Sequence, residues 1–213
     1  MPFLCCEQGK VRLLSKCKIW QVLLMELEKI HEILRQVLTK ERYLHSLGVE
    51  KASVELALIH GEDKVKAKKA GLLHDYGKQF SAQELLNKAE ELGLPVSRVE
   101  ENNPELLHAP IGALLVERDL GIKDEEILEA ISCHTTGEAY MSRLSRIVFL
   151  ADYIEENRTF PGIEEIRDLS RTDLDMSVLR AIDRTILYVI ERGFLLHPKS
   201  VHFRNTLILK MQR

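Results

Sequence analysis

The sequence predicts an all-α protein, and three observations favour this fold class. Apolar residues recur at intervals of three and four along most of the chain, which is the period of a helix with one buried face. Capping residues and glycines stand at the ends of these segments. Alternation of apolar and polar residues, which is typical of strands, is almost absent. With 213 residues and 45% hydrophobic content, the chain is long enough to form one sizeable core.

Four helices are predicted in the first half of the chain. Gly61 is expected to close the second, because glycine favours the conformation that ends a helix. Ser81 and Glu84 have the spacing of a capping box at the start of the fourth, and Pro95 closes it. The four helices are expected within residues 23–38, 51–60, 62–77 and 81–95.

Five further helices are predicted in the second half. One of them has Pro110 at a favoured first position and Gly121 at a favoured last position. Asp124 is the expected N-cap of the next helix, and Gly193 is expected to end the longest one. The five segments are residues 110–121, 124–134, 142–158, 172–193 and 199–212. No internal repeat or linker interrupts them, so we expect a single all-α domain.

Composition and charge disfavour several classes of protein. A net charge of -3 and a pI near 6.3 do not indicate a nucleic-acid or anionic-membrane partner. No apolar run approaches the roughly 18 residues of a membrane span, and the first ten residues match a signal peptide only weakly. Cys5, Cys6, Cys17 and Cys133 lack the paired spacing of a zinc site. We therefore expect reduced thiols and a cytoplasmic location.

Polar residues interrupt the apolar helices at three places. His45 lies at a helix junction, His74 and Asp75 end the apolar run "AGLL", and Asp152 lies inside "IVFLADYI". Burial of an unpaired charge costs several kcal/mol, so these groups are expected to have partners. Two imidazoles and two carboxylates form a suitable ligand set for a first-row divalent metal, which would neutralise both carboxylates.

Each of these residues also has a structural interpretation. A buried ion pair to Arg146 or Arg158 would account for Asp152, and such pairs stabilise a fold only weakly. A lone histidine such as His45 is more often a satisfied core or surface residue than a ligand. The four residues taken together favour the metal site over these separate explanations.

The pattern His45 … His74-Asp75 … Asp152 resembles the H…HD…D signature of the HD-domain metal-dependent phosphohydrolases, a helical superfamily. An isolated HD dipeptide is a weak signal, but "LLHDYGK" with "RYLHS" upstream and "LADYIEENR" downstream is a strong one. The sequence is similar, more closely, to the bacterial HD-type symmetrical bis(5′-nucleosyl)-tetraphosphatases, and "HTTG" and "ADYIEENR" are its most specific blocks. The resemblance covers most of the chain from about Leu27 and implies an HD-domain helical bundle.

The resemblance implies roles for particular residues. Asp75 and Lys78 are implied to be catalytic. The implied metal is iron, although nitrogen and oxygen ligands suit manganese, nickel and zinc comparably. The implied metal ligands are His45, His74, Asp75 and Asp152. The implied substrate-binding residues are His45, Asp75, Tyr76, Gly77, Lys78, His108, His134, Thr135, Asp152, Arg158, Ser200, Val201, His202, Phe203, Arg204 and Asn205.

The implied reaction is hydrolysis of diadenosine tetraphosphate at its central bridge, which gives two molecules of ADP. Lys78 and Arg158 could neutralise charge on the phosphoryl oxygens, although basic residues are more often ordinary surface charges. His108 and His134 could bind a second metal or the phosphates. A nucleophilic pair of Cys133 and His134 is disfavoured, because neighbours on one helix rarely meet in space.

Two other functions stay open at the level of sequence. The chain could be another HD nucleotide phosphohydrolase, such as a nucleotidase or phosphodiesterase, or a nucleotide-binding regulator without catalysis. The presence of all four implied metal ligands and of Lys78 disfavours the regulator. We expect a small dinucleotide as the partner, with no nucleic acid and no membrane, and a homodimer is compatible with the sequence.

The first 24 residues lie upstream of the resemblance and contain none of the implied site residues. Met25 opens a suitable first helix. We therefore expect a dispensable N-terminal extension over residues 1–24 and a phosphohydrolase domain over residues 25–213. The alternative is that residues 13–24 extend this helix and bury Trp20, in which case their removal would expose core.

Overall fold

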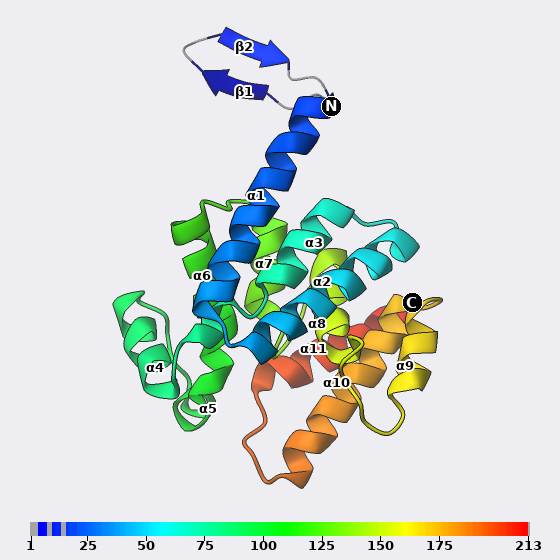
Figure 1. Ribbon diagram of the computed structural model, residues 1–213. Coiled ribbons are helices and arrows are strands. Elements are labelled where there is room, and N and C mark those ends of the chain that lie inside the picture. Colours follow the sequence, from blue (N-terminus) through cyan, green and yellow to red (C-terminus); the bar gives the residue numbers. More distant parts are fainter. Residues whose placement is uncertain (1–3, 8–9, 14–15, 213) are drawn as a thin grey trace. The chain divides into compact units, whose positions relative to one another are not determined.

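The computed structural model describes the backbone of residues 4–7, 10–13 and 16–212, and the side chains of residues 25–212. The chain divides into two compact units, Met1–Val37 and Leu38–Arg213 (Figure 1). Every residue of the predicted site belongs to the second unit.

The first unit consists of a β-hairpin and a long helix. Strands β1 (Leu4–Glu7) and β2 (Lys10–Leu13) pair antiparallel. The sequence pattern did not predict this hairpin, because strands of four residues are too short to show a clear alternation. Helix α1 (Lys16–Val37) begins upstream of Met25, as the alternative interpretation of this region required. The predicted burial of Trp20 lies outside the described side chains, and the boundary between residues 24 and 25 stays a prediction.

The second unit is built from helices, which confirms the predicted all-α fold class. Its α-helices are α2 (Lys40–His60), α3 (Lys64–Leu73), α4 (Ala82–Glu91), α5 (Arg98–Asn102), α6 (His108–Leu120), α7 (Glu125–Cys133), α8 (Arg143–Ile154), α9 (Ile163–Ser170), α10 (Leu174–Glu191) and α11 (Pro198–Met211), with two 3-10 turns, η1 (Tyr76–Gln79) and η2 (Pro104–Leu107). Gly61 closes α2 in the left-handed conformation, with φ of 69°. Ser81 and Glu84 form both hydrogen bonds of the predicted capping box, and Asp124 caps α7.

Helix α8 contacts α2, α3, α7, α9 and α10, and it forms the centre of the second unit. Its side chains Ile147, Val148 and Leu150 are fully buried. Helices α2 and α3 approach each other closely because Gly71 has no side chain. A Cβ atom at Gly71 would lie 2.6 Å from the Oγ atom of Ser53. The helices that carry His45, His74 and Asp152 are therefore held close together by the core itself.

The chain changes direction at the predicted metal ligands. The sequence predicted that this helix ends near Gly77, but helix α3 ends at Leu73. The 3-10 turn η1 follows after Asp75. The cause is a close approach between backbones, because a Cβ atom at Gly77 would collide with the carbonyl oxygen of His108 at the start of α6. This contact fixes η1 against α6. Because the helix ends there, the adjacent side chains of His74 and Asp75 can face the same centre.

Helix α11 supports the turn that follows α7. The Oγ atom of Ser200 donates a hydrogen bond to the carbonyl oxygen of Thr136 at 2.8 Å. The ring of Phe203 is buried under Gly137, whose φ of 72° and lack of a side chain make room for it. Within the described part of the chain, no helix has both the length and the apolar character that crossing a bilayer demands.

Candidate metal centre

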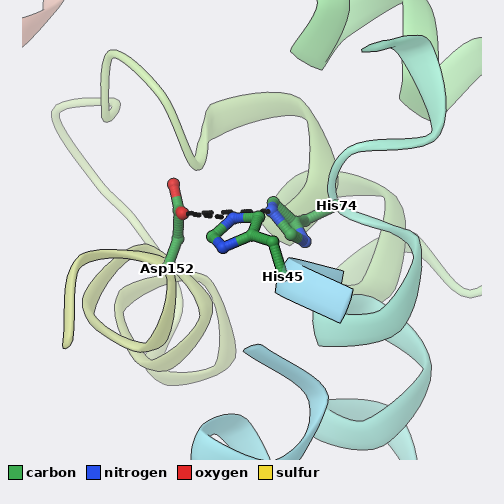
Figure 2. A group of neighbouring side chains, drawn as sticks. All are labelled: His45, His74 and Asp152. Carbon is green, nitrogen blue, oxygen red and sulfur yellow. Dashed lines mark hydrogen bonds and ion pairs between the residues drawn. The ribbon is translucent and has the colours of Figure 1, made fainter. Parts of the chain in front are cut away.

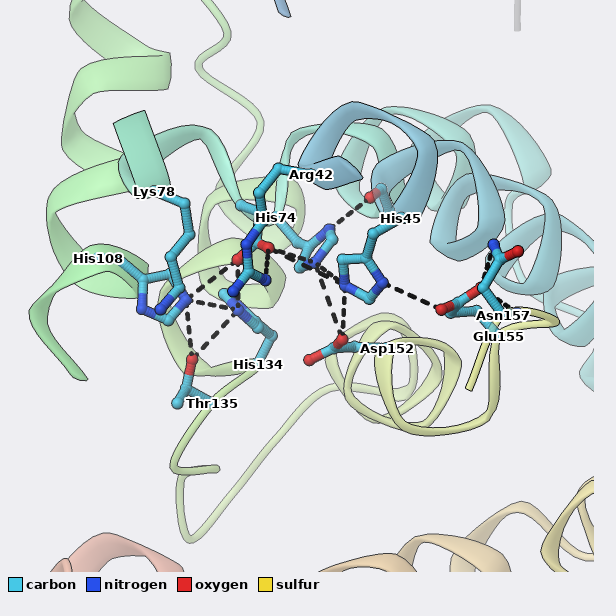
Figure 3. Close-up of polar contacts among 12 residues, drawn as sticks. Arg42, His45, His74, Lys78, His108, His134, Thr135, Asp152, Glu155 and Asn157 are labelled. Carbon is cyan, nitrogen blue, oxygen red and sulfur yellow. Dashed lines mark hydrogen bonds and ion pairs between the residues drawn. The ribbon is translucent and has the colours of Figure 1, made fainter. Parts of the chain in front are cut away.

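Four imidazole rings form a continuous row inside the second unit (Figure 3). The rings succeed one another in the order His45, His74, His134 and His108. Each contacts the next edge to face, with distances of 5.2, 4.9 and 4.9 Å between ring centroids. We call these four residues the histidine row. It unites four of the five histidines for which the sequence predicted a role in metal or substrate binding, and His202 on α11 lies outside it.

The row lies where several helices meet, and two carboxylates face it. The six side chains come from α2 (His45), the C-terminal cap of α3 (His74), the residue before η1 (Asp75), the start of α6 (His108), the C-terminal cap of α7 (His134) and the last turn of α8 (Asp152). No two of them apart from the adjacent His74 and Asp75 come from one element, so the site depends on the packing of the whole unit.

Three of the four rings are held by a backbone carbonyl oxygen three residues earlier in the chain. The Nδ1 atom of His74 lies 2.8 Å from the carbonyl oxygen of Gly71, and the Nδ1 atom of His134 lies 2.7 Å from that of Ile131. His108 makes the same contact with the carbonyl oxygen three residues before it. Since a carbonyl oxygen can only accept, Nδ1 carries the hydrogen in each ring. The Nε2 atoms therefore keep their lone pairs, and these point into the row.

The first group of ligand atoms comprises His45, His74 and Asp152, and we call it the outer group (Figure 2). The Nε2 atom of His45 lies 2.9 Å from Oδ1 of Asp152 and 3.3 Å from Nε2 of His74. His45 and Asp152 are partly exposed, whereas His74 is fully buried. The outer group therefore opens toward solvent at one end.

The second group comprises His74, Asp75 and His134, and we call it the inner group. All three side chains are buried. The Oδ1 atom of Asp75 lies 3.2 Å from Nε2 of His108 and 3.7 Å from Nε2 of His134, and its Oδ2 atom lies 3.6 Å from Nε2 of His74. The hydroxyl of Thr135 lies 3.1 Å and 3.2 Å from the Nε2 atoms of His134 and His108. Oδ2 of Asp75 also lies 3.9 Å from Nε2 of His45, so Asp75 approaches all four rings, and His74 belongs to both groups.

Two arginines contact the two carboxylates. Arg42 Nη1 lies 3.0 Å from Oδ2 of Asp75, and Arg158 Nη2 lies 2.8 Å from Oδ1 of Asp152. The ion pair that the sequence offered as an alternative explanation of Asp152 is therefore present, with Arg158 as the partner. Both arginines and His45 line a hollow of about 340 Å³. Two guanidinium groups consequently stand at the opening of the site, together with the carboxylates of Glu41 and Glu155.

The buried rings of the inner group are poorly suited to carry charge. Burial lowers the pKa of His134 to about 3, and the neighbouring His74 and His108 act in the same direction. Burial likewise lowers the pKa of His74. Neutral imidazole is the form that binds a metal, so these rings are prepared for ligation.

The pKa values of the carboxylates and of His45 are shifted toward the charged forms instead. Burial opposes the ionisation of Asp152, but the hydrogen bond from His45 and the charges around it hold its pKa below the usual range. Asp75 is buried as well, and its neighbours His74 and His108 keep its pKa well below the usual value. Burial also opposes a charge on His45, but its hydrogen bond to Asp152 outweighs this and raises its pKa.

These residues fit a divalent first-row metal. Within each group, one ligand atom from every residue lies within 4.8 Å of the others. The fixed Nδ1 atoms leave Nε2 of His74 and His134 free, and carboxylate oxygens complete a nitrogen and oxygen set of the kind that such metals accept. A divalent metal would also neutralise the buried carboxylate of Asp75 and the partly exposed one of Asp152, which explains why apolar helices carry them.

Comparison with known proteins gives the same assignment. The model of the HD domain family matches residues 42–157, which is more than half of the chain. A symmetrical bis(5′-nucleosyl)-tetraphosphatase of Bacillus subtilis (strain 168) is 38% identical over 184 residues, covering 86% of this chain and 98% of the relative. The chain is a member of this HD-domain family. A symmetrical bis(5′-nucleosyl)-tetraphosphatase of Staphylococcus aureus (strain NCTC 8325 / PS 47) is 34% identical over 183 residues, which are 85% of this chain and 94% of the relative.

A solved structure supports the fold of this member of the bis(5′-nucleosyl)-tetraphosphatase family. The crystal structure of a predicted HD superfamily hydrolase involved in NAD metabolism, from Clostridium acetobutylicum, resembles it with a TM-score of 0.84 and 39% identity. The match covers 86% of this chain and 97% of that one. The predicted HD-domain helical bundle is therefore confirmed.

The other residues of the "HDYGK" segment lie beside the row. Tyr76 is buried, and Gly77 provides the close contact with His108 described above. Lys78 Nζ lies 2.8 Å from a carboxylate oxygen of Glu105, the residue whose carbonyl oxygen holds the ring of His108. Contact of these residues with a nucleotide stays a prediction.

The predicted substrate-binding residues of α11 divide into two sets. Ser200 and Phe203 are buried and support the turn after His134, so the fold brings them next to the site from behind. Arg204 forms an ion pair with Asp183. Val201 is partly buried, and His202 and Asn205 are exposed. Their role toward a nucleotide stays a prediction.

Three residues of the site were missed in the sequence. Arg42 lies one helical turn before His45, and this spacing could have indicated it. Glu155 and Asn157 follow Asp152 in the "ADYIEENR" block, but nothing local indicates that Glu155 contacts His45, 110 residues away.

Burial raises the pKa of the Cys133 thiol to about 12, which agrees with the prediction that it is no nucleophile.

Proposed function

We propose that this chain hydrolyses diadenosine tetraphosphate symmetrically, by adding water across the central phosphoric anhydride bridge to give two molecules of ADP. The observation that carries the proposal is the juxtaposition of a buried ligand set with two arginines at its opening, in a chain of the bis(5′-nucleosyl)-tetraphosphatase family. The water oxygen bonds to one of the two central phosphorus atoms, and the bridging oxygen leaves with the other.

The metal in this proposal is held by His45, His74, Asp75 and Asp152. When bound, such a metal supplies hydroxide at neutral pH, because it lowers the pKa of water toward about 7. We propose iron as the metal, following the family resemblance. Manganese, nickel or zinc would suit the same nitrogen and oxygen ligands.

The remaining side chains bind and orient the phosphates. Arg42 and Arg158 contact the ligand carboxylates, and a guanidinium group in this position can bind phosphoryl oxygens with two parallel hydrogen bonds. They would stabilise the negative charge that phosphoryl transfer concentrates on these oxygens. Lys78 would also contact a phosphate oxygen, and its present ion pair with Glu105 would then break. His108, His134 and Thr135 would contact the phosphates or a second metal beyond Asp75.

Product analysis tests the reaction. The metal-reconstituted protein is incubated with diadenosine tetraphosphate, and the products are separated by chromatography. We expect ADP alone. Release of ATP with AMP would show asymmetric cleavage and would refute the proposal. Turnover of mononucleotides with the dinucleotide left intact would favour another HD phosphohydrolase, and binding of the dinucleotide without turnover would favour a regulator.

Three further properties are part of the proposal. We propose a cytoplasmic location and a homodimer, the second of which analytical ultracentrifugation would test.

We also propose that residues 1–24 are dispensable, so that a chain beginning at Met25 keeps its metal content and its ADP-forming activity. Aggregation of that chain, or a melting temperature lower by many degrees, would show that the extension belongs to the domain.

A further inference from the structure

His45 differs from the other rings of the histidine row in what holds it. Its Nδ1 atom lies 3.2 Å from Oε1 of Glu155, a carboxylate (Figure 3). The other three rings use a backbone carbonyl oxygen three residues earlier in the chain. Glu155 is the C-terminal cap residue of α8, and only 2% of its surface is exposed. A buried carboxylate with no role would be costly, so this contact requires an explanation.

The second carboxylate oxygen of Glu155 is held just as firmly. Oε2 accepts hydrogen bonds from the backbone N–H of Asn157 at 2.7 Å and from its Nδ2 atom at 2.9 Å. The carboxylate therefore has one oxygen for two donors of Asn157 and the other for the ring of His45. Its orientation is fixed, because Asn157 offers donors only on that side.

The surrounding structure leaves room for this carboxylate and fixes the backbone that carries it. A Cβ atom at Gly48, one turn after His45 on α2, would collide with Oε2 of Glu155. Arg167 donates hydrogen bonds to the carbonyl oxygens of Ile154 at 2.8 Å and of Glu155 at 2.6 Å. Two hydrogen bonds from Asn157 to the carboxylate and two from Arg167 to the backbone thus place Glu155 against His45.

We infer that Glu155 is a positioning residue that keeps Nδ1 of His45 as the hydrogen-bond donor and leaves Nε2 for the metal. This inference rests on the proposed role of His45 as a metal ligand. A carboxylate behind a ligating imidazole fixes the orientation of the ring and makes its free nitrogen a stronger ligand. His45 is the ring at the open end of the site, where no local carbonyl performs this task, so a buried carboxylate from α8 does so.

The substitution Glu155→Gln gives a sharp test, because glutamine has nearly the same shape but one acceptor and one donor. The two donors of Asn157 require the acceptor, so the glutamine amide must turn its NH₂ group toward Nδ1 of His45. That contact favours the tautomer with the hydrogen on Nε2, which cannot bind a metal. Glu155→Ala removes the acceptor but introduces no opposing donor, and a water molecule can then accept from Nδ1.

The experiment measures zinc binding to metal-free protein by calorimetry, together with its melting temperature. We expect Glu155→Gln to weaken zinc binding by about 10- to 100-fold, the usual effect of losing a partner behind a metal ligand. Glu155→Ala is expected to weaken zinc binding less but to lower the melting temperature more, because it leaves a cavity. The matched control is Glu156→Gln, whose carboxylate is exposed and pairs with Lys51, and it should change neither quantity.

The outcome depends on which of the two Glu155 variants weakens zinc binding more. If alanine weakens zinc binding as much as glutamine or more, Glu155 acts through packing and the inference is wrong. Wild-type affinity in Glu155→Gln would overturn it as well. His45→Ala separates this inference from the function on which it rests. Loss of zinc in His45→Ala with normal affinity in Glu155→Gln refutes only the role of Glu155, whereas normal affinity in both refutes the ligand assignment of His45.

Discussion

The two ends of the histidine row are held in place by different means. In the inner group, His74 and His134 each use a carbonyl oxygen three residues earlier in the chain. In the outer group, His45 uses Glu155, which is 110 residues away. One end of the site is therefore oriented by the local geometry of a helix end, and the other by tertiary packing between α2 and α8. Changes in packing should disturb the outer group first.

The two groups also differ in charge. The rings of the inner group are buried and favour the neutral form, whereas His45 in the outer group favours the charged form beside Asp152. Each group has one arginine on its carboxylate, Arg42 on Asp75 and Arg158 on Asp152. The inner group is therefore the buried part of the site, and the outer group is the part that opens toward solvent.

The largest effect is expected from Asp152→Ala, which removes a proposed metal ligand of the outer group. We expect loss of bound metal and a fall in kcat/KM beyond the roughly 100-fold that partners of metal ligands reach. Elemental analysis and circular dichroism would show metal loss with the helices retained. Asp175→Ala, which breaks an ion pair with Arg146 and Lys210, is the control. Full activity with unchanged metal content would remove Asp152 from the ligand set.

Gly77→Ala should damage the inner group through the fold. The added methyl group collides with the backbone of His108, which cannot move aside as a side chain can. We expect a loss of about 3 kcal/mol in the free energy of unfolding, at the upper end for overpacking, and a melting temperature lower by roughly 6–12 °C. Gly61→Ala is the control, because its Cβ would meet nothing within 4 Å and costs only about 1–2 kcal/mol of left-handed strain. Equal effects would show that η1 can separate from α6 freely.

Arg158→Lys should weaken substrate binding without removing metal. Lysine cannot reproduce the two parallel hydrogen bonds of a guanidinium group, and a lost hydrogen bond to a charged group costs about 1.5–3 kcal/mol. We expect kcat/KM to fall about tenfold or more, mainly through KM. Arg42→Lys is the matching change at the inner carboxylate. Unchanged kinetics in Arg158→Lys would return this residue to an ordinary ion pair with Asp152.

The smallest effect concerns the pH dependence of stability in the metal-free protein. The pKa of His134 is lowered from about 6.5 to about 3, so between these pH values only the unfolded state binds the proton. The free energy of unfolding therefore falls as the pH falls below about 6.5. His45, whose pKa is raised, contributes stability that is fully present below about pH 6.5 and is lost as the pH rises through its folded value. His134→Gln should therefore flatten the decline below about pH 6.5, measured by denaturant unfolding, by up to about 1.4 kcal/mol per pH unit. His45→Gln should leave that decline unchanged and should instead remove the loss of stability as the pH rises above about 6.5. The same slope in both variants would contradict the difference in charge between the groups.

The fold could be predicted largely from the sequence because its signals are local. The capping box of Ser81 and Glu84 and the closure of α2 at Gly61 depend on residues a few positions apart, and both were confirmed. The early end of α3 was not predicted, because it depends on contact between Gly77 and α6.

The site likewise could be predicted where its signals are local in the sequence, and it was missed where it depends on contacts between distant segments. The resemblance identified the residues of the histidine row, and the structure brings them together. Glu155 and Asn157 were missed, because a carboxylate in "IEEN" looks like any exposed charge until α8 lies against α2. The pairing of β1 with β2 was missed because both strands are short.

The support of the turn after α7 by α11 has a consequence for the order in which this protein matures. The hydroxyl of Ser200 and the ring of Phe203 hold the turn after His134 and Thr135, and Ser200 bonds a residue 64 positions earlier. During synthesis, which proceeds from the N-terminus, His45, His74 and Asp75 leave the ribosome long before this support exists. A nascent chain therefore carries the proposed metal ligands before the turn that bears His134 and Thr135 has its support, and the inner group is complete only after α11 has emerged and docked.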